Sequence, residues 1–340
     1  MNVGIIGAGF IGDEHGDAIR QIPGMVISGV CRTNKIELEK MAHKFQAKAY
    51  EDYRNLLADH NIDIVVIATP HHLHTDIAIE AARMGKHFML EKPMALTLKE
   101  CDIIIDAAAT AKVKLNVGFC GRFIKTYQKA REIVASGEIG SLVYGVATLS
   151  SPWMQGNRRS WHLDRKTGGG MWLTNGTHYL DRLTWFMGSD IITVSGKLFI
   201  CFHNQKANDA GMVFVRYANG ACGTIVSTGY QDGAPKNLIE LTGTKGMINV
   251  GYNSVSIGKN GKWQQIENCS DEQLMSDFML RQWQEFLFSI ENDTEPPVTG
   301  SYARGIMEAA FAAEVSSHYG KEIRLPLDKK YETFIEDLIK

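Results

Sequence analysis

A glycine-rich run near the start of the chain has the residue types and the spacing that bind a dinucleotide. It follows the short apolar run at 3–6 and reads Gly7-Ala8-Gly9-Phe10-Ile11-Gly12. Gly7 permits a sharp turn, Gly9 leaves room for a pyrophosphate, and Gly12 lets the following helix pack close to the strand. The phosphates would lie against N–H groups of Phe10 and Ile11 at the positive end of that helix. The alternative is a glycine-rich turn without a ligand.

A lysine comes directly after a later apolar run, in Glu91-Lys92-Pro93. Ligands of a parallel sheet bind beyond the carboxyl ends of its strands. We therefore expect Glu91 and Lys92, together with Thr69 and Pro70 after the apolar run 64–67, to line the nicotinamide half of a cleft. A dinucleotide cradle and an ammonium at this edge indicate a redox enzyme.

The residues after the second predicted strand, at 25–30, bear on the choice of cofactor. An acidic residue here would bind both ribose hydroxyls and favour NAD, but the chain has Cys31-Arg32-Thr33-Asn34. Arg32 can pair with a 2′-phosphate, and Thr33 can donate a hydrogen bond. We predict NADP as the preferred cofactor over NAD, partly because no carboxylate in this run would repel the phosphate. The alternative is that Arg32 is a solvated surface residue.

Composition limits the classes of partner and the compartment. The 340 residues include 36 basic and 38 acidic side chains, without a basic stripe for nucleic acid. No stretch of about twenty apolar residues would span a bilayer, and the chain starts without a signal-peptide pattern. Six scattered cysteines without a C-x-x-C pair favour reduced thiols. We expect a cytoplasmic protein whose partners are a small-molecule substrate and copies of itself.

The pattern of elements predicts two domains. Strands and helices alternate over roughly the first 120 residues, which is typical of a doubly wound parallel sheet in an α/β Rossmann domain. From there strands and hairpins dominate, with turns at Asn219-Gly220 and Asn260-Gly261, and predict an α+β domain around a large, mostly antiparallel open sheet. We place the domains at 1–121 and 122–340, with the C-terminal helix able to pack back on the first.

One face of the second sheet would carry helices such as 171–186. The other face must be covered, and a second subunit is the simplest cover in an enzyme of this size. We therefore expect a homodimer or a homotetramer that assembles through this sheet.

A histidine in the second domain has the spacing of a proton-transfer group. A helix after Gly168-Gly169-Gly170 would place Thr174, His178 and Asp181 on one face, because they are four and three residues apart. Beside a nicotinamide, His178 could take the proton of a substrate hydroxyl as hydride leaves its carbon. The alternative is a core histidine that Asp181 or a backbone carbonyl satisfies.

These motifs together resemble the Gfo/Idh/MocA oxidoreductases, which include glucose–fructose oxidoreductase and inositol dehydrogenases. The resemblance covers essentially the whole chain and rests on the glycine run, Glu91-Lys92-Pro93, the triple glycine and Gly176-Thr177-His178-Tyr179-Leu180-Asp181. It implies an NAD(P)-dependent dehydrogenase or reductase. Lys92 matches the family lysine that binds the reacting oxygen, and His178 matches the family acid or base. The family aspartate four residues before this histidine is Thr174 here, which makes Thr174 the third candidate catalytic residue.

The substrate is expected to be a sugar, a cyclitol or a related cyclic hydroxy compound. Indole faces suit a sugar ring, and guanidinium groups suit a carboxylate or a phosphate. An aromatic dihydrodiol or a carboxylated ring is the alternative substrate. Packing tryptophans and solvated or intersubunit arginines are the alternative to a substrate site. The candidate substrate residues are Trp153, Arg158, Arg159, Trp161, His162, Asn175 and His178.

No metal site is expected, and two further functions stay open. His71, His72 and His74 lack the spacing of a zinc site, and only His74 is kept as a cofactor contact. The chain could be a dinucleotide-binding regulator without turnover, since Thr174 replaces an aspartate. It could also hold its cofactor tightly and act as a redox-cycled sugar epimerase or lyase.

Overall fold

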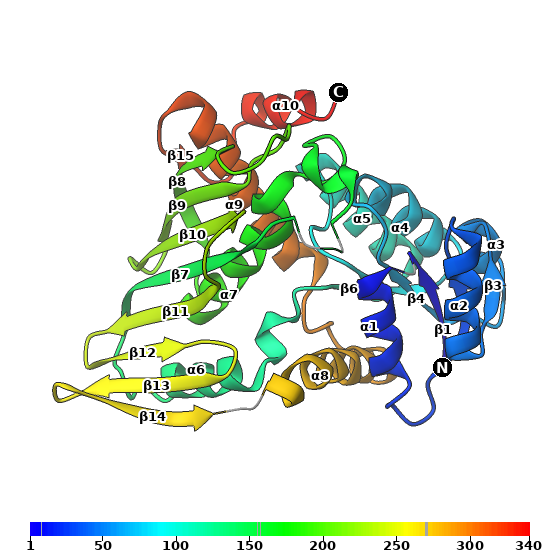
Figure 1. The fold of residues 1–340 in the computed structure, drawn as a ribbon, viewed down its shortest axis with the longest axis horizontal. Helices are drawn as coiled ribbons and strands as arrows, with labels where there is room; N and C mark the ends of the chain where they lie inside the picture. Colours follow the sequence, from blue (N-terminus) through cyan, green and yellow to red (C-terminus); the bar gives the residue numbers. More distant parts are fainter. Residues whose placement is uncertain (8, 155, 157, 269–270) are drawn as a thin grey trace. The chain divides into compact units, whose positions relative to one another are not determined.

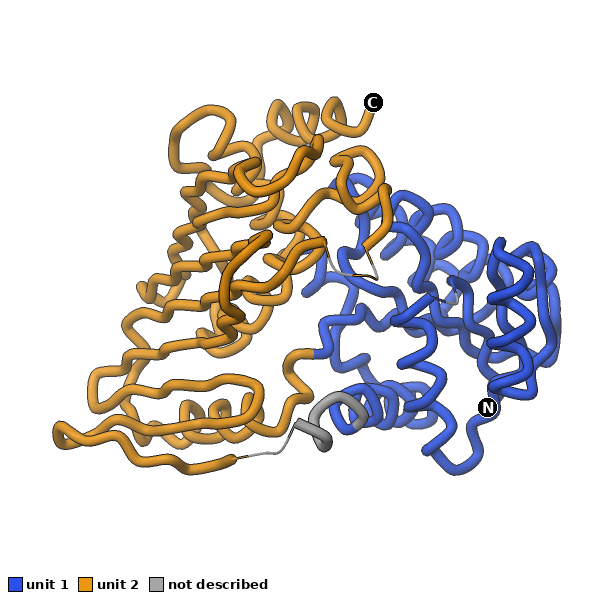
Figure 2. The backbone as a smooth tube through the Cα atoms, viewed as in Figure 1, with its two compact units in different colours: residues 1–120, 276–304 blue, residues 121–275, 305–340 orange. Residues whose placement is uncertain are grey.

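The computed structural model describes residues 1–7, 9–154, 156, 158–268 and 271–340, and only the backbone of 271–276. Figure 2 shows its two compact units, residues 1–120 with 276–304 and residues 121–275 with 305–340. The first unit thus ends one residue before the expected boundary and also includes 276–304. The C-terminal helix belongs to the second unit.

A six-stranded parallel sheet forms the centre of the first unit, and this confirms the predicted Rossmann topology (Figure 1). Its strand order is β3-β2-β1-β4-β5-β6, with the change of direction beside β1 that creates a ligand site in such sheets. The strands are β1 Asn2–Ile6, β2 Val26–Cys31, β3 Lys48–Tyr50, β4 Ile64–Ile67, β5 His87–Leu90 and β6 Leu115–Val117.

Helices connect these strands, and several begin with a side-chain cap. The predicted capping box is confirmed, because Thr97 Oγ1 accepts a hydrogen bond from Glu100 N at 3.2 Å. Asn34 and Asp52 cap two helices that the sequence analysis left unassigned. The helices are α1 Phe10–Ile19, α2 Lys35–Phe45, α3 Tyr53–Leu57, the short 3₁₀ helix η1 His71–Leu73, α4 His74–Arg83 and α5 Leu98–Ala111.

A helix from far along the chain completes the core of the first unit. Helix α8, Asp271–Glu291, buries Met279, Trp283 and Phe286 against strands β1, β2, β4 and β5 and helices α1 and α2. Helix α9, Gly300–Tyr319, begins in the first unit and continues in the second. Burial of the three α8 side chains stabilises the first unit by about 1.5–3 kcal/mol each, so α8 is an integral part of the dinucleotide domain.

A nine-stranded sheet forms the second unit, in the order β14-β13-β12-β11-β7-β10-β9-β8-β15. Among the described strands of this sheet, only β7 and β10 pair in parallel, so the predicted mostly antiparallel sheet is confirmed. The predicted hairpins also form, at 219–220 between β9 and β10 and at 260–261 between β13 and β14. The strands are β7 Leu142–Pro152, β8 Ile191–Phe199, β9 Ala210–Tyr217, β10 Cys222–Tyr230, β11 Lys236–Gly243, β12 Gly246–Val250, β13 Ser254–Lys259, β14 Lys262–Asn268 and β15 Ile323–Arg324.

Helices cover one face of this sheet, as Figure 1 shows. Helix α6 packs on β12, β13 and β14, and α7 packs on β7 and β10. The opposite face carries outward side chains that are 41–55% exposed, among them Tyr144, Met212 and Met247. The helical elements of this unit are η2 Cys120–Phe123, which starts at the unit boundary, α6 Lys125–Ala135, η3 Ser160–Leu163, the π-helical turn η4 Trp172–Gly176, α7 Thr177–Met187 and α10 Lys329–Asp337.

The structure also bears on membrane insertion and on the cysteines. Within the described residues, no helix is both long and apolar enough to cross a membrane. Five cysteines, at 31, 101, 120, 201 and 222, are free thiols, while Cys269 lies outside the described residues.

Candidate active site

The glycine run forms a turn between β1 and α1 whose shape fits a pyrophosphate. Gly7 has φ +92°, and a Cβ there would touch the carbonyl oxygen of Ala68. A Cβ on Gly12 would lie 2.7 Å from Gly7 O, whereas a Cβ on Gly9 would meet nothing within 4 Å. Gly7 and Gly12 are thus required by close packing, and the space beside Gly9 is open for a ligand. Ala8 lies outside the described residues.

The start of α1 offers the positive end of a helix to that ligand. Gly9 is the N-cap residue and has no side chain to bind the first-turn N–H groups. Phe10 is 52% exposed, and Ile11 is half-buried in the same turn. This arrangement fits the diphosphate of a dinucleotide cofactor.

An arginine just after β2 lies near a carboxylate on the following helix. Arg32 Nη1 lies 3.8 Å from Glu37 Oε2, on the first turn of α2, and Thr33 is exposed. Asn34 caps α2 by accepting a hydrogen bond from Glu37 N at 3.1 Å. The run 31–34 itself has no carboxylate, as expected, but Glu37, one helical turn later, lies beside Arg32 and was missed.

His74 joins the loops that follow β4 and β5. Its Nδ1 lies 3.0 Å from Pro93 O and its Nε2 lies 3.0 Å from Thr69 O. Burial lowers the pKa of His74, although both carbonyl groups act to raise it. A neutral imidazole donates to one carbonyl at a time, and the ring fixes Thr69 and Pro70 relative to the lysine motif.

A buried hydrogen-bonded line runs from α8 to the residue before Lys92. Trp283 Nε1 donates to His15 Nδ1 at 2.9 Å, and His15 Nε2 lies 3.0 Å from Glu91 Oε1. Tryptophan is only a donor, so Nδ1 of His15 accepts and Nε2 carries the proton that binds Glu91. Glu91 Oε2 in turn accepts from Lys92 N at 3.2 Å. The line fixes the carboxylate and the backbone of the lysine motif.

This line keeps Glu91 ionised. Burial acts to raise the pKa of Glu91, but the hydrogen bond from His15 and the charge of Lys92 lower it below its ordinary value. The carboxylate therefore stabilises the fold at neutral pH, and this contribution is lost as the pH falls through the depressed folded-state pKa.

In the second unit, the predicted helix that begins at Met171 starts with a π-helical turn and continues as α7. Trp172 holds this turn, since its backbone N donates to Asn208 Oδ1 at 2.7 Å and its Nε1 donates to Ala310 O at 3.0 Å. A Cβ on Gly176 would run into the Trp172 indole. Thr174 is buried within the π turn, and His178 is half-buried in the first turn of α7.

Asp181 forms a buried ion pair with an arginine. Arg122 Nη2 donates to Asp181 Oδ1 at 2.7 Å, and the Asp181 side chain is fully buried. A buried ion pair of this kind is costly to break. Sequence reasoning considered Asp181 as a partner of His178 and missed Arg122, which no local pattern connects to it.

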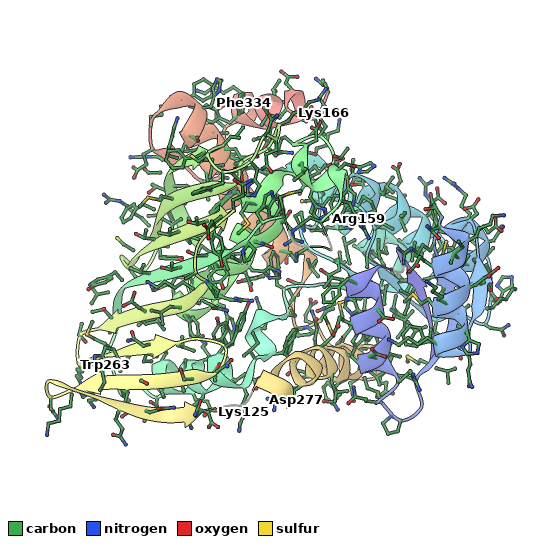
Figure 3. The ribbon with its side chains drawn as sticks, viewed as in Figure 1. Lys125, Arg159, Lys166, Trp263, Asp277 and Phe334 are labelled. Carbon is green, nitrogen blue, oxygen red and sulfur yellow. The ribbon has the colours of Figure 1, made fainter. Side chains whose placement is uncertain are left out.

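The candidate substrate residues divide into a buried and a more exposed set. Trp153 is fully buried and its Nε1 donates to Gln205 Oε1 at 2.8 Å. His162 stacks on Trp161 with ring centres 3.6 Å apart and meets the edge of Trp153. Figure 3 labels Arg159, which is exposed. Asn175 is half-buried, and its Nδ2 lies 3.2 Å from Met171 Sδ.

Lys92 belongs to the first unit, whereas Thr174, His178 and the candidate substrate residues belong to the second. Among the described residues, no group of three or more His, Cys, Asp or Glu side chains is placed to hold a metal ion.

Replacing Trp283 by phenylalanine should remove the donor to His15 and leave a buried acceptor unpaired. The expected loss is about 1–3 kcal/mol of unfolding free energy, measured by urea denaturation at neutral pH. Trp263→Phe is the matched control, because Trp263, labelled in Figure 3, is 51% exposed on β14. Equal losses in the two variants would contradict a specific role for the Trp283 hydrogen bond.

Comparison with known proteins identifies the family of this chain. Residues 1–119 match the family model described as "Oxidoreductase family, NAD-binding Rossmann fold", and residues 127–249 match the GFO/IDH/MocA C-terminal domain. Myo-inositol 2-dehydrogenase of Thermotoga maritima is 26% identical, over 96% of this chain and 98% of the relative. The scyllo-inositol 2-dehydrogenase (NAD(+)) of Bacillus subtilis is 27% identical, over 96% and 97%.

A solved structure of levoglucosan dehydrogenase with NADH and levoglucosan has the same fold, with a TM-score of 0.89 and 22% identity over 96% of this chain and 99% of that one. The two family models together match well over half of the chain, in the order in which its domains occur. The chain therefore belongs to the Gfo/Idh/MocA family and is an NAD(H)-binding oxidoreductase.

Proposed function

We propose that this enzyme is a dehydrogenase that moves hydride between nicotinamide and a carbinol carbon of a sugar or a cyclitol. The observation that carries the proposal is the open space beside Gly9, between two glycines that close packing requires. Two of the relatives that match along nearly their whole length are inositol dehydrogenases, which supports a cyclic polyhydroxy substrate.

The chain supplies groups for the proton and for the charge on oxygen. A bound nicotinamide would accept or return the hydride. Lys92 would donate a hydrogen bond to the reacting oxygen and stabilise negative charge on it. His178 would take the hydroxyl proton in oxidation and return it in reduction.

Thr174 would hold its neighbours in place without adding charge. Its hydroxyl can bind an imidazole or a substrate oxygen, but it cannot stabilise imidazolium as a carboxylate does. Asp181 is already paired with Arg122 at 2.7 Å. A group of the substrate or the cofactor would then supply part of the charge that accompanies His178 protonation.

Lys92→Ala should lower kcat by about 10²- to 10³-fold, the usual effect of losing an oxyanion donor. His178→Ala should lower kcat by about 10²- to 10⁴-fold, the usual effect of losing a general acid or base. The dissociation constant for NADH, measured by fluorescence titration, should change little. Reduction of the nicotinamide is followed by absorbance with a panel of sugars, cyclitols and aromatic diols.

Other outcomes of this assay favour the other readings. Full activity in either variant would remove that residue from the mechanism. Cofactor binding without any turnover across the panel would favour a dinucleotide-binding regulator. Cofactor that stays bound through desalting and turns over without added dinucleotide would favour a redox-cycled epimerase or lyase.

We further propose that NADP(H) is preferred over NAD(H). Arg32 at the end of β2 supports this preference, and Glu37, 3.8 Å from it, opposes it. Arg32 would have to turn from Glu37 toward the 2′-phosphate when NADP binds.

The preference predicts opposite effects for two substitutions. Arg32→Ala should lower kcat/KM for NADP by about tenfold or more, the value of a charge-assisted contact, and change that for NAD little. Glu37→Gln should raise kcat/KM for NADP, because it removes a carboxylate from the phosphate site. A wild-type enzyme that uses NAD at least as well as NADP would contradict the proposed preference.

A homodimer or homotetramer through the open sheet also stays a proposal. The apolar side chains Tyr144, Met212 and Met247 on its outer face support it, since exposed apolar surface of this kind favours association. A monomeric molar mass by light scattering would contradict it. The cytoplasmic location stays a prediction from the sequence.

A further inference from the structure

Arg158 is a cation without a counter-charge in the segment between β7 and η3. Its Nε is closed off from solvent and has no hydrogen-bond partner among the described residues. No described carboxylate lies within ion-pair distance of it. Arg122 and Arg165 of the same unit, in contrast, pair with Asp181 and Glu314, each at 2.7 Å.

The environment of Arg158 makes an incoming anion favourable. Burial lowers the pKa of Arg158 to about 10, and no neighbouring charge opposes this effect. The guanidinium is still charged at neutral pH, so the protein holds a partly desolvated cation. Such a group costs free energy, which a bound anion with matching hydrogen bonds would offset.

The guanidinium rests on a rigid aromatic surface. Its central carbon lies 4.7 Å from the centre of the Trp153 ring. Trp153 is fully buried, and its Nε1 binds Gln205 at 2.8 Å. An arginine stacked on an indole keeps its N–H groups for a ligand and loses little freedom when it binds one.

Hydrogen bonds connect this surface to the helix that carries the proposed catalytic histidine. Gln205 Nε2 donates to Asn208 O at 3.0 Å, and that carbonyl also accepts from Met171 N at 2.8 Å. Asn208 Oδ1 binds the backbone N of Trp172 at 2.7 Å. Trp153 and the turn that holds Thr174 are thus fixed to the same loop.

The residues that follow Arg158 are anchored. Arg159 N donates to His162 Nδ1 at 3.0 Å. Further on, Arg165 makes a two-point ion pair with Glu314 of α9, at 2.7 and 2.9 Å. A charged group in an anchored segment is a better ligand-binding element than one on a free loop.

We propose that Arg158 binds a carboxylate of the substrate, so that the enzyme acts on an acidic sugar or cyclitol. The inference rests on the proposed function, because it assigns a substrate class to the same site. A single guanidinium balances a singly charged carboxylate better than a doubly charged phosphate.

Matched acid and amide pairs test this assignment. The pairs are D-glucuronate with D-glucuronamide, D-galacturonate with D-galacturonamide and D-gluconate with D-gluconamide, and each pair differs in one negative charge. Binding to the protein with NADH is measured by calorimetry, and kcat/KM by nicotinamide absorbance. We expect at least one acid to exceed its amide by about tenfold or more in both measurements.

Three variants separate the role of Arg158 from general charge effects. Arg158→Gln should abolish the acid preference, and Arg158→Lys should retain part of it. Lys166→Gln is the matched control, because Lys166 is exposed in the loop after η3, as labelled in Figure 3, and its loss should leave the preference unchanged. Circular dichroism and the unfolding midpoint show whether each variant is folded.

The possible results separate a failure of the inference from a failure of the proposed function. Equal use of acids and amides, binding of neither, or an acid preference that survives Arg158→Gln would overturn the inference. Oxidation of neutral sugars alone would do so while supporting the proposed function. Arg158-dependent binding of acids without any hydride transfer would support the inference and contradict the proposed function. An Arg158-dependent preference for D-glucose 6-phosphate over every acid would replace carboxylate by phosphate.

Discussion

The buried hydrogen bond between His15 and Glu91 is the interaction on which the proposed chemistry of the first unit depends. Glu91 lies next to Lys92, the proposed donor to the reacting oxygen, and its carboxylate would be costly to bury without a donor. His15 comes from α1, the helix that also presents the phosphate cradle, and Trp283 from α8 sets its tautomer. Hydrogen bonds therefore connect the cradle helix, the lysine motif and α8, and a substitution in one of them would change the position or the charge of the groups in the others.

This coupling explains why a helix from late in the chain belongs to the dinucleotide unit. Met279, Trp283 and Phe286 fill its core with apolar surface, and Trp283 in addition supplies the single hydrogen-bond donor that the ring nitrogen of His15 requires. A Rossmann sheet ending at β6 would lack both. The expected domain boundary near residue 121 followed the change from alternating elements to hairpins, and it missed this return of the chain because helix periodicity does not say what a helix packs against.

Local features were predictable, and long-range pairs were not. The cradle could be predicted from Gly7, Gly9 and Gly12, because their roles depend on immediate neighbours in the chain. The helix start at Thr97 and Glu100 could be predicted for the same reason. Glu37 beside Arg32 was missed although it is close in sequence, because the loop was considered without the helix that follows. Arg122 with Asp181 and His15 with Trp283 are fixed by tertiary packing, and no spacing rule connects them. The roles of Lys92, Thr174 and His178 stay predictions that the geometry of each unit accommodates.

Thr174 and Arg158 have a common electrostatic explanation. The resemblance to the family implies an aspartate at position 174, and a fixed negative charge there would repel an acidic substrate. A threonine removes that repulsion and keeps a hydroxyl for positioning. A substrate carboxylate held by Arg158 would then bring a negative charge into the unit that carries His178, where it would favour the imidazolium that forms during oxidation. In this account the charge that polyol enzymes build into the protein is carried by the substrate, and the loss of the aspartate and the unpaired arginine are two parts of one change in specificity.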